Sequence, residues 1–307
     1  MIIVKLQGGL GNQMFQYAIG RKLSMLNKTT LKLDLSFLLD RTTRENFEFR
    51  EYDLDIFALE PYFATYQDIK NFVTTQGKGI KTQVYKYLVN PFLSQKYIKE
   101  NSFSFNSNIL SLTGNLYLDG YWQSPLYFED IKAEIKKDFR YISANLPEQG
   151  EHLLTLIKAN QSVCLHVRRG DFVYNTTNSK VHGFVGLDYI QTAMERMTNI
   201  ISSPIFIVFS DDINWCLENI KTAHSIIFVS RDYLQQKVNY NRKLELSNTH
   251  YLMQSCKHFV ISNSTFSWWA AWLSNHDNKI VIYPKKWFND SSINTSDLMP
   301  SEWIQIP

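Results

Sequence analysis

The sequence predicts an α/β protein made of two halves that join near residue 150. Apolar runs of strand length alternate with amphipathic stretches of helical period along most of its 307 residues. The segment 141–150 (YISANLPEQG) carries a proline and a glycine between two such alternations, which is typical of a linker. A chain of this length can form two ordinary domains. We therefore expect two Rossmann-like domains, at residues 1–150 and 151–307.

The first half opens with a strand, a glycine-containing loop and a helix. Residues 2–6 (IIVKL) are of β type, the loop is 7–13 (QGGLGNQ), and residues 14–27 place apolar side chains on one helical stripe. Residues 30–36 (TLKLDLS) then alternate at strand period. This β-loop-α-β unit indicates that the chain begins as an α/β domain.

The rest of the first half is less regular. Residues 40–115 show few clear periods, and we expect insertions that determine specificity there. Residues 115–130 predict a short strand, a turn and the start of a helix that continues through 131–139.

The second half repeats the alternation of helix and strand more clearly. The expected helices are 151–160, 187–198, 215–221, 242–256 and 265–274, and the expected strands are 162–167, 204–210, 225–230, 258–262 and 279–284.

Composition and charge exclude several classes of protein. Apolar residues at 44% and charged residues at 20% are globular values. A net charge of +3 is too small to indicate nucleic-acid or membrane binding. The three cysteines are widely spaced without a CxxC pair, which favours buried thiols in a reducing compartment. Without a signal-like or membrane-spanning apolar run, we expect a cytoplasmic protein.

The stretch CLHVRRGDF (164–172) places two arginines directly after a predicted core strand. Ligands of open α/β sheets bind at the carboxyl ends of strands, and guanidinium groups match phosphate oxygens, so Arg168 and Arg169 suit a pyrophosphate. One arginine would face the ligand while its neighbour pairs with Asp171. A purely structural ion pair is the alternative. His166 within the strand is more typical of a structural hydrogen-bonding residue.

Two pairs of acidic residues are candidate ligands of a metal or a nucleotide. Asp211 and Asp212 follow the strand 204–210, where a carboxylate could hold a metal, accept guanine N–H groups or bind a ribose. Asp53 and Asp55 form a DxD triplet, but no apolar strand leads into it. We expect the triplet to lie at a solvated edge and no metal to be bound.

A strand also leads into the segment SNST before the helix 265–274. Asn263, Ser264 and Thr265 are good N-cap residues, and hydroxyls beside free N–H groups can cradle a phosphate. An ordinary N-cap is the alternative. The two adjacent tryptophans of this helix are expected in the core.

The N-terminal loop is a further candidate anion site. Gly9, Gly11 and Asn12 lie between strand and helix, where N–H groups and the helix dipole attract anions or sugar oxygens. The third glycine of a dinucleotide fingerprint falls on Met14, which weakens an NAD-binding interpretation. A turn that needs glycine only for its backbone is the alternative, although Asn12 and Gln13 supply directed amide groups.

Several segments together resemble the family 11 α-1,2-fucosyltransferases. They are GGLGNQMFQYA, LDGYWQSPLYF, HVRRGD, HGFVGLDYI, SDD with Trp215 soon after, and SNSTFSWWAAWL, in family order from residue 7 to about 290. The resemblance implies a glycosyltransferase-B fold with GDP-fucose as donor, bound in the C-terminal domain 151–307. It also implies a galactose-ended glycan as acceptor, on the side of the N-terminal domain 1–150. It further implies inversion at the fucose carbon, no essential metal and no other cofactor. A lipid-linked acceptor would bring the protein to a membrane surface.

By match to the family motif, His166, Arg168, Arg169 and Asp171 belong to the donor site, with Arg168 assigned to the phosphates. In related fucosyltransferases a proposed base lies five residues after the motif aspartate. Here that position is Thr176, so the assignment does not carry over.

The general base therefore has three candidates: Asp171, His182 and the leaving phosphate itself. Asp171 is preferred because it belongs to the shared motif. Two other function classes stay open, an NAD-dependent oxidoreductase and a non-catalytic sugar-nucleotide-binding protein.

Overall fold

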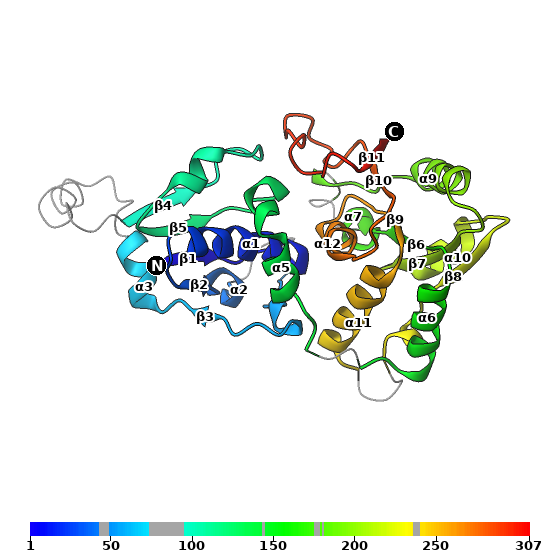
Figure 1. The fold of residues 1–307 in the computed structure, drawn as a ribbon, viewed down its shortest axis with the longest axis horizontal. Helices are drawn as coiled ribbons and strands as arrows, with labels where there is room; N and C mark the ends of the chain where they lie inside the picture. The colour runs from blue at the N-terminus through cyan, green and yellow to red at the C-terminus, as the bar shows by residue number, and fades with distance from the viewer. Residues whose placement is uncertain (43–48, 74–94, 143–144, 175–178, 180, 236–239) are drawn as a thin grey trace, which may run out of the picture. The chain divides into compact units, whose positions relative to one another are not determined.

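The computed structural model divides the chain into two compact units. Unit 1 comprises Met1–Arg140 with Asn294–Met299, and unit 2 comprises Tyr141–Ile293 with Pro300–Pro307. The structure describes all residues except 43–48, 74–94, 143–144, 175–178, 180 and 236–239 (Figure 1). The boundary falls after Arg140, whereas the sequence predicted it near residue 150, and the segment 294–299 joins unit 1.

Unit 1 contains a five-stranded sheet in which all strand pairs are parallel. Its strands are β1 (Ile2–Lys5), β2 (Leu31–Asp34), β3 (Tyr62–Phe63), β4 (Gln95–Lys99) and β5 (Asn115–Asp119), in the order β3-β2-β1-β5-β4. The buried apolar β1 lies at the centre, opposite β2 on one side and β5 on the other. The chain order reverses between β1 and β5, which makes their carboxyl ends a topological switch point.

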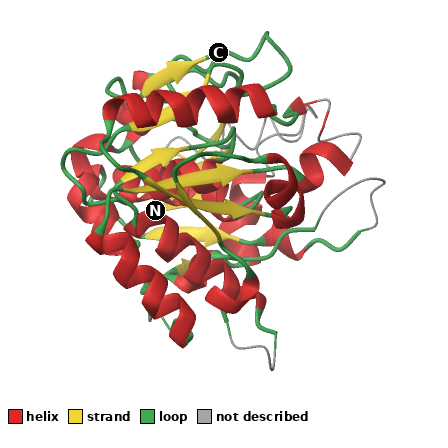
Figure 2. Ribbon diagram, turned by 90° about the vertical axis from the view of Figure 1, so that its right-hand side faces the viewer, coloured by secondary structure: helices red, strands yellow, loops and turns green. Residues whose placement is uncertain are grey.

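Helices, strands and the loops that join them, coloured red, yellow and green in Figure 2, make up the described chain, and in unit 1 helices pack against the strands of the sheet. They are α1 (Leu10–Leu26), α2 (Ser36–Leu39), α3 (Tyr66–Val73) and α5 (Lys132–Asp138), with 3₁₀ turns η1 (Leu54–Ile56), η3 (Ser107–Ser111), η4 (Pro125–Tyr127) and η5 (Glu129–Ile131). The first helix begins at Leu10 with Gly9 as its N-cap, so the predicted start at Met14 was too late. Residues 40–115, predicted to be irregular, also supply the two edge strands of the sheet.

Unit 2 contains a six-stranded sheet, again with parallel pairing throughout its described strands. The strands are β6 (Ser162–Val167), β7 (Ile205–Ser210), β8 (Ser225–Phe228), β9 (His258–Val260), β10 (Val281–Pro284) and β11 (Ile304–Ile306), in the order β11-β10-β9-β6-β7-β8. All six residues of β6 are buried, because helices cover both faces of a parallel sheet. The order reverses between β6 and β9, so a second switch point lies at their carboxyl ends.

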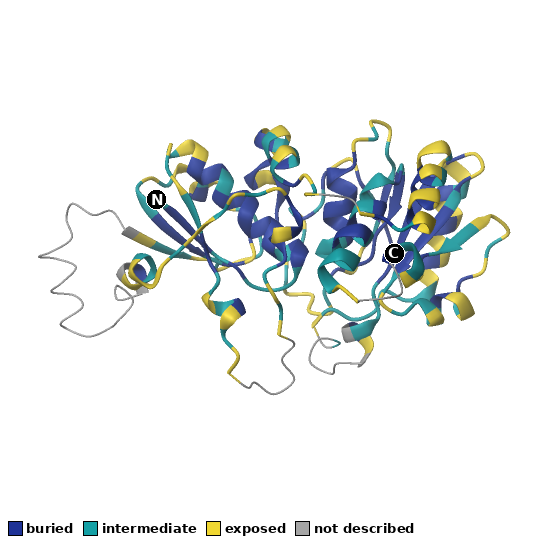
Figure 3. Cartoon of the chain, turned by 90° about the horizontal axis from the view of Figure 1, so that it is seen from below, coloured by how far each residue is buried: buried dark blue, intermediate teal, exposed yellow. Residues whose placement is uncertain are grey.

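The helices of unit 2 enclose a dense core. They are α6 (Glu148–Ala159), α7 (Gly170–Tyr174), α9 (Leu187–Ile200), α10 (Ile213–Asn219), α11 (Arg242–Ser255) and α12 (Thr265–Leu273), with the 3₁₀ turn η6 (Arg231–Tyr233). Figure 3 shows the buried residues concentrated in the strands and the inner helix faces. Trp268 and Trp269 of α12 are fully buried, as predicted. The three cysteines are also buried and free of disulfides, as predicted.

The α/β class predicted from the sequence is confirmed in both units. Within the described residues, no helix is both long enough and apolar enough to span a bilayer.

Candidate functional site

Two arginines leave the central strand of unit 2 at its carboxyl end. β6 ends at Val167, and Arg168 and Arg169 follow it at the edge of the sheet beside the switch point. β7 lies next to β6 with Val167 opposite Ser210, so Asp211 and Asp212 leave the neighbouring strand at the same edge. Adjacent parallel strands thus bring both arginines and both acids together.

Arg168 is the more accessible of the two arginines. Its Nη1 lies 3.0 Å from Asp211 Oδ2, and its side chain remains 26% exposed. The guanidinium carbon lies 5.6 Å from the ring centroid of Phe172. A guanidinium carries five N–H donors, so the pairing with Asp211 does not by itself use all of them.

Arg169 is enclosed by aromatic rings. Its guanidinium carbon lies 4.1 Å from the ring centroid of Trp215 and 5.1 Å from that of Phe184. Its Nε lies 3.3 Å from Asp212 Oδ2, and its side chain is only 11% exposed. Its backbone N–H donates to Asp211 Oδ1 at 2.8 Å. Arg169 therefore fixes the strand ends to each other.

The sequence did not indicate that Asp211 and Asp212 pair with the arginines. Their position after a strand predicts a metal or a nucleotide as their partner. Asp211 also lies so close to Gly170 that an added Cβ there would meet its Oδ2 at 2.7 Å. Glycine at position 170 thus lets Asp211 reach both arginines.

His166 is buried within the site. Its Nδ1 lies 2.8 Å from the hydroxyl of Ser262, which links β6 to the segment after β9. Burial, followed by the charge of Arg168 and by His250, lowers the pKa of His166 to about 3. The imidazole is therefore neutral near pH 7, which suits positioning better than proton transfer.

The segment before α12 is anchored through Asn263. Its side-chain amide lies 3.1 Å from the His182 carbonyl, 3.0 Å from the Gly183 carbonyl and 3.1 Å from the Trp287 carbonyl. Ser264 is the N-cap residue of α12, but its side chain caps no backbone N–H of that helix. Thr265 is the first helical residue. The buried Asn263 therefore holds the loop that carries His182 beside the helix start.

His182 lies close to the arginines through an aromatic contact. Its ring stacks on Phe172 with centroids 4.8 Å apart and planes within 4°. Phe172 also contacts Arg168, so these three side chains lie in series. Asp171 is the second residue of α7, and its side chain, like all of Thr176, lies outside what the structure describes.

The predicted residues of the N-terminal loop lie in unit 1. Gly9 caps α1, Gly11 and Asn12 fall in its first turn, and the Oδ1 of Asn12 accepts from Gln123 Nε2 at 2.9 Å. Gln123 follows β5, so this contact joins the carboxyl ends of β1 and β5. The loop therefore lies at the switch point of the N-terminal sheet, in a different unit from the arginines.

Gln13 is a structural residue of this loop. It is fully buried, and its Nε2 donates to the carbonyls of Gly8 at 2.9 Å and Glu51 at 2.8 Å. Its Oε1 accepts from the N–H of Asp53, which is buried. The expectation that this DxD triplet lies at a solvated edge was wrong for Asp53, because its backbone is tied to a buried amide. Among the described residues, no three potential metal-ligating side chains gather into a cluster.

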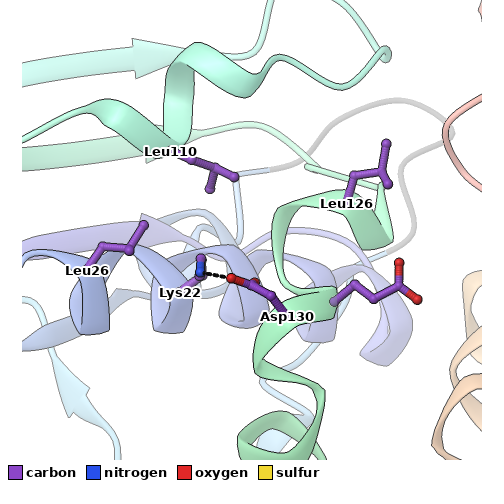
Figure 4. A pocket seen from close by; sticks show the side chains of 6 residues that line it. Lys22, Leu26, Leu110, Leu126 and Asp130 are labelled. Carbon is purple, nitrogen blue, oxygen red and sulfur yellow. Dashed lines mark hydrogen bonds and ion pairs between the residues drawn. The ribbon is translucent and has the colours of Figure 1, made fainter.

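A cavity of about 580 Å³ lies elsewhere on unit 1, between α1, the turn η3 that precedes β5 and the turns η4 and η5 that follow it (Figure 4). Its lining residues are Lys22, Leu26, Leu110, Leu126, Glu129 and Asp130. Lys22 forms an ion pair with Asp130 across it. It contains none of the predicted site residues, and neither switch point borders it. The chemistry is therefore assigned to the strand ends.

Comparison with known proteins gives a consistent result. The sequence profile described as Glycosyl transferase family 11 matches residues 1–307. An alpha-1,2-colitosyltransferase of Escherichia coli is 32% identical over 311 residues, covering 100% of this chain and 99% of that protein. A galactoside alpha-(1,2)-fucosyltransferase 2 of Pongo pygmaeus is 31% identical over 167 residues, covering 52% of this chain and 46% of the relative.

Solved structures show a similar fold. A mutant of Arabidopsis thaliana FUT1 in complex with GDP superimposes with a TM-score of 0.53 at 12% identity, covering 97% of this chain and 74% of that one. This likeness confirms the predicted fold of two Rossmann-like α/β halves, of glycosyltransferase-B type.

Proposed function

The chain belongs to glycosyl transferase family 11, and from that premise we propose that it transfers L-fucose from GDP-β-L-fucose to the 2-hydroxyl of a terminal galactose. The acceptor is an oligosaccharide or a precursor of a cell-surface glycan. The similarity to a galactoside alpha-(1,2)-fucosyltransferase supports this linkage and acceptor. In the reaction the bond from fucose C1 to the diphosphate breaks, a bond from C1 to galactose O2 forms, and GDP leaves.

The accessible Arg168 at the carboxyl end of β6 is the observation that carries this proposal. The planar guanidinium can donate two parallel N–H bonds to phosphate oxygens and keeps its charge at any relevant pH. Negative charge grows on GDP as its bond to fucose breaks, and a fixed cation at that place stabilises the transition state. In the proposed mechanism the arginine performs the role that a metal ion has in metal-dependent transferases.

The β-linked donor and α-linked product require a single displacement that inverts the fucose carbon. The attacking hydroxyl must lose a proton as the new bond forms. Asp171 is the proposed acceptor of that proton, and His182 and the leaving phosphate are the alternatives. His166 is assigned a positioning role, because its imidazole is buried and neutral.

A second donor has specific support. One relative that matches the whole chain is a colitosyltransferase, and colitose is fucose without its 3-hydroxyl group. GDP-colitose is therefore the second candidate. The two donors share the nucleotide and the phosphates, so the role of Arg168 is the same for both.

Ligand-dependent melting tests the donor. We expect GDP and GDP-fucose to raise the melting temperature of the wild-type protein, and NAD to leave it unchanged. In the Arg168→Ala variant the shift with GDP should shrink strongly. A shift with NAD or UDP-sugars and none with GDP would contradict the proposal and favour an oxidoreductase or another transferase.

Turnover separates an enzyme from a sugar-nucleotide-binding protein. The protein is incubated with GDP-fucose or GDP-colitose and a panel of β-galactosides, and the product linkage is determined by NMR. An α-1,2-linked product is expected. Binding of GDP-fucose without transfer to any galactoside would favour the non-catalytic alternative.

A further inference from the structure

An acidic side chain holds the loop that follows the central strand β5 of unit 1. Glu100 comes directly after β4, and its Oε2 accepts from the N–H of Tyr121 at 2.7 Å. Its Oε1 accepts from the N–H of Trp122 at 2.9 Å. One carboxylate therefore fixes two consecutive backbone groups, and charge-assisted bonds of this kind are stronger than neutral ones.

The loop needs such support because its backbone is strained. Trp122 has a φ of +57°, in the left-handed region that residues other than glycine rarely adopt. Its ring is buried at 2% exposure and packs edge-on against Tyr127. Strained backbone persists where the surroundings enforce it, and it concentrates at functional sites.

Position 120, which precedes Tyr121 and the strained Trp122, is a glycine for a steric reason. An added Cβ on Gly120 would lie 2.4 Å from Glu100 Cβ and 2.8 Å from Glu100 Oε2. The same glycine accepts a hydrogen bond from Gln16 of α1 through its carbonyl, at 3.2 Å. Gly120 therefore allows the acid to approach while α1 holds the loop from the other side.

The loop lies where a ligand is expected to bind. It follows β5 at the switch point with β1, and Gln123 joins it to Asn12 at the start of α1. Gly120, Trp122 and Gln123 are all buried, whereas Tyr121 between them is 39% exposed. The loop thus holds one partly exposed tyrosine between buried neighbours. An aromatic face of this kind packs against the C–H groups of a pyranose ring.

We propose that Tyr121 is a platform for a sugar ring of the glycan acceptor and that Glu100 is the positioning residue that fixes this platform. The inference rests on the proposed function, because it assigns the acceptor of that reaction to unit 1. Burial raises the pKa of the Glu100 carboxyl although two N–H groups bind it.

The test compares acceptor and donor kinetics for matched variants. Tyr121→Ala should raise the KM for the galactoside acceptor about tenfold, the effect of losing one good contact. The KM for GDP-fucose and kcat at saturating acceptor should stay near the wild-type values. Tyr121→Phe keeps the ring and should restore the acceptor KM. Since Tyr121 is partly exposed, its substitution should leave the melting temperature close to that of the wild type.

Glu100 is tested by the isosteric Glu100→Gln, which retains one acceptor oxygen for the two N–H groups. The acceptor KM should rise several-fold, with the donor KM unchanged. The control is Glu60→Gln, at an exposed acid of the same unit, which should alter neither constant. A lower melting temperature with an unaltered acceptor KM would mean that Glu100 is only structural, contrary to the proposal.

Failure of the inference and failure of the proposed function give different results. An unchanged acceptor KM in Tyr121→Ala, in an enzyme that still transfers fucose, would overturn the platform alone. If the wild type binds no GDP, the proposed function fails. In a protein that binds GDP without turnover, saturation-transfer NMR with a β-galactoside provides the test. A signal that weakens in Tyr121→Ala supports the platform, and an unaltered signal or no binding overturns it.

Discussion

The guanidinium of Arg168 lies 3.0 Å from the carboxylate of Asp211, across the ends of the neighbouring strands β6 and β7. The charge of Arg168 is therefore balanced before any ligand binds. A pyrophosphate must share or replace this partner, and the exposed quarter of the side chain is where it can do so. The ion pair holds the guanidinium at the strand end. The side chain of Arg168 therefore loses less conformational freedom when the ligand binds.

Arg168→Ala should lower turnover by about 10² to 10³, the usual cost of losing one strong charge-stabilising donor. Arg168→Lys should recover little, because a point charge lacks the planar fork. Both are checked by kcat with GDP-fucose. A lysine variant with a near-native rate would refute bidentate phosphate binding.

Substitution of the neighbouring Arg169 should act on stability. Its side chain is nearly buried between Trp215 and Phe184 and is paired with Asp212. Arg169→Ala should lower the free energy of unfolding by about 2 to 3 kcal/mol, because the partly buried Asp212 loses its ion pair with this arginine. Urea unfolding measures this change, with Arg231→Ala, at a mostly exposed ion pair, as the control. Equal effects of the two substitutions would contradict the structural role of Arg169.

Turnover should survive a metal chelator. In the proposed mechanism arginine stabilises the leaving diphosphate, and Asp211 and Asp212 are engaged by the two arginines. The rate with EDTA should stay within about twofold of the untreated rate, a change below 0.5 kcal/mol in barrier. A manganese-dependent transferase assayed in parallel confirms that chelation is effective. Activity that is lost with EDTA and restored by Mn²⁺ would reassign the two acids as metal ligands.

Acid should destabilise unit 2 through its buried histidines. Burial lowers the pKa of His166 to about 3 and those of His250 and His258 to about 4, from an ordinary value of 6.5. Between pH 6.5 and these values the unfolded chain binds more protons than the folded one. The free energy of unfolding therefore falls as the pH falls through this window, by up to about 1.4 kcal/mol per pH unit for each histidine.

Unfolding in urea at pH 7, 6 and 5 measures this slope. His166→Asn removes one of these titrations and should make the slope shallower. The exposed His152 provides the matched control, since His152→Asn should leave it unaltered. A slope identical in all three proteins would show that His166 does not contribute.

The regularity of unit 2 could be predicted from the sequence because its strands are buried on both faces. β7, for example, is a continuous apolar run, IFIVF, before Ser210. The edge strands of unit 1 gave no such signal. β3 has two exposed residues, and β4 (QKYIK) mixes polar with apolar side chains, so neither shows a recognisable period.

The candidate site was predictable in its residues and less so in its contacts. The arginine motif located the strand end, but the pairing of Arg168 with Asp211 depends on β6 lying beside β7 in a particular register. The spacing of residues along the chain does not predict which residues of β6 and β7 lie opposite each other. The role of Glu100 could not be predicted from the sequence. Glu100 binds backbone N–H groups of a loop about twenty residues away, and nearly every residue type carries such a group.

The last prediction concerns the proton acceptor. Asp171→Asn removes a carboxylate and keeps the size of the side chain. If Asp171 is the base, turnover should fall by about 10² to 10⁴ while GDP-fucose still binds. Binding is measured by calorimetry and turnover by GDP release, so that the two effects are separated. Loss of binding together with turnover would make Asp171 a positioning residue.

His182→Gln is the matched variant for the second candidate. The ring of His182 stacks on Phe172 beside Arg168, so its removal should weaken donor binding and lower kcat only modestly. If kcat instead falls as far as expected for Asp171→Asn, with the donor still bound, His182 is the base. Substantial turnover in both single variants and in the double variant would leave the leaving phosphate as the proton acceptor. The pH profile of kcat in the double variant then reports on the diphosphate, because neither side chain remains to titrate.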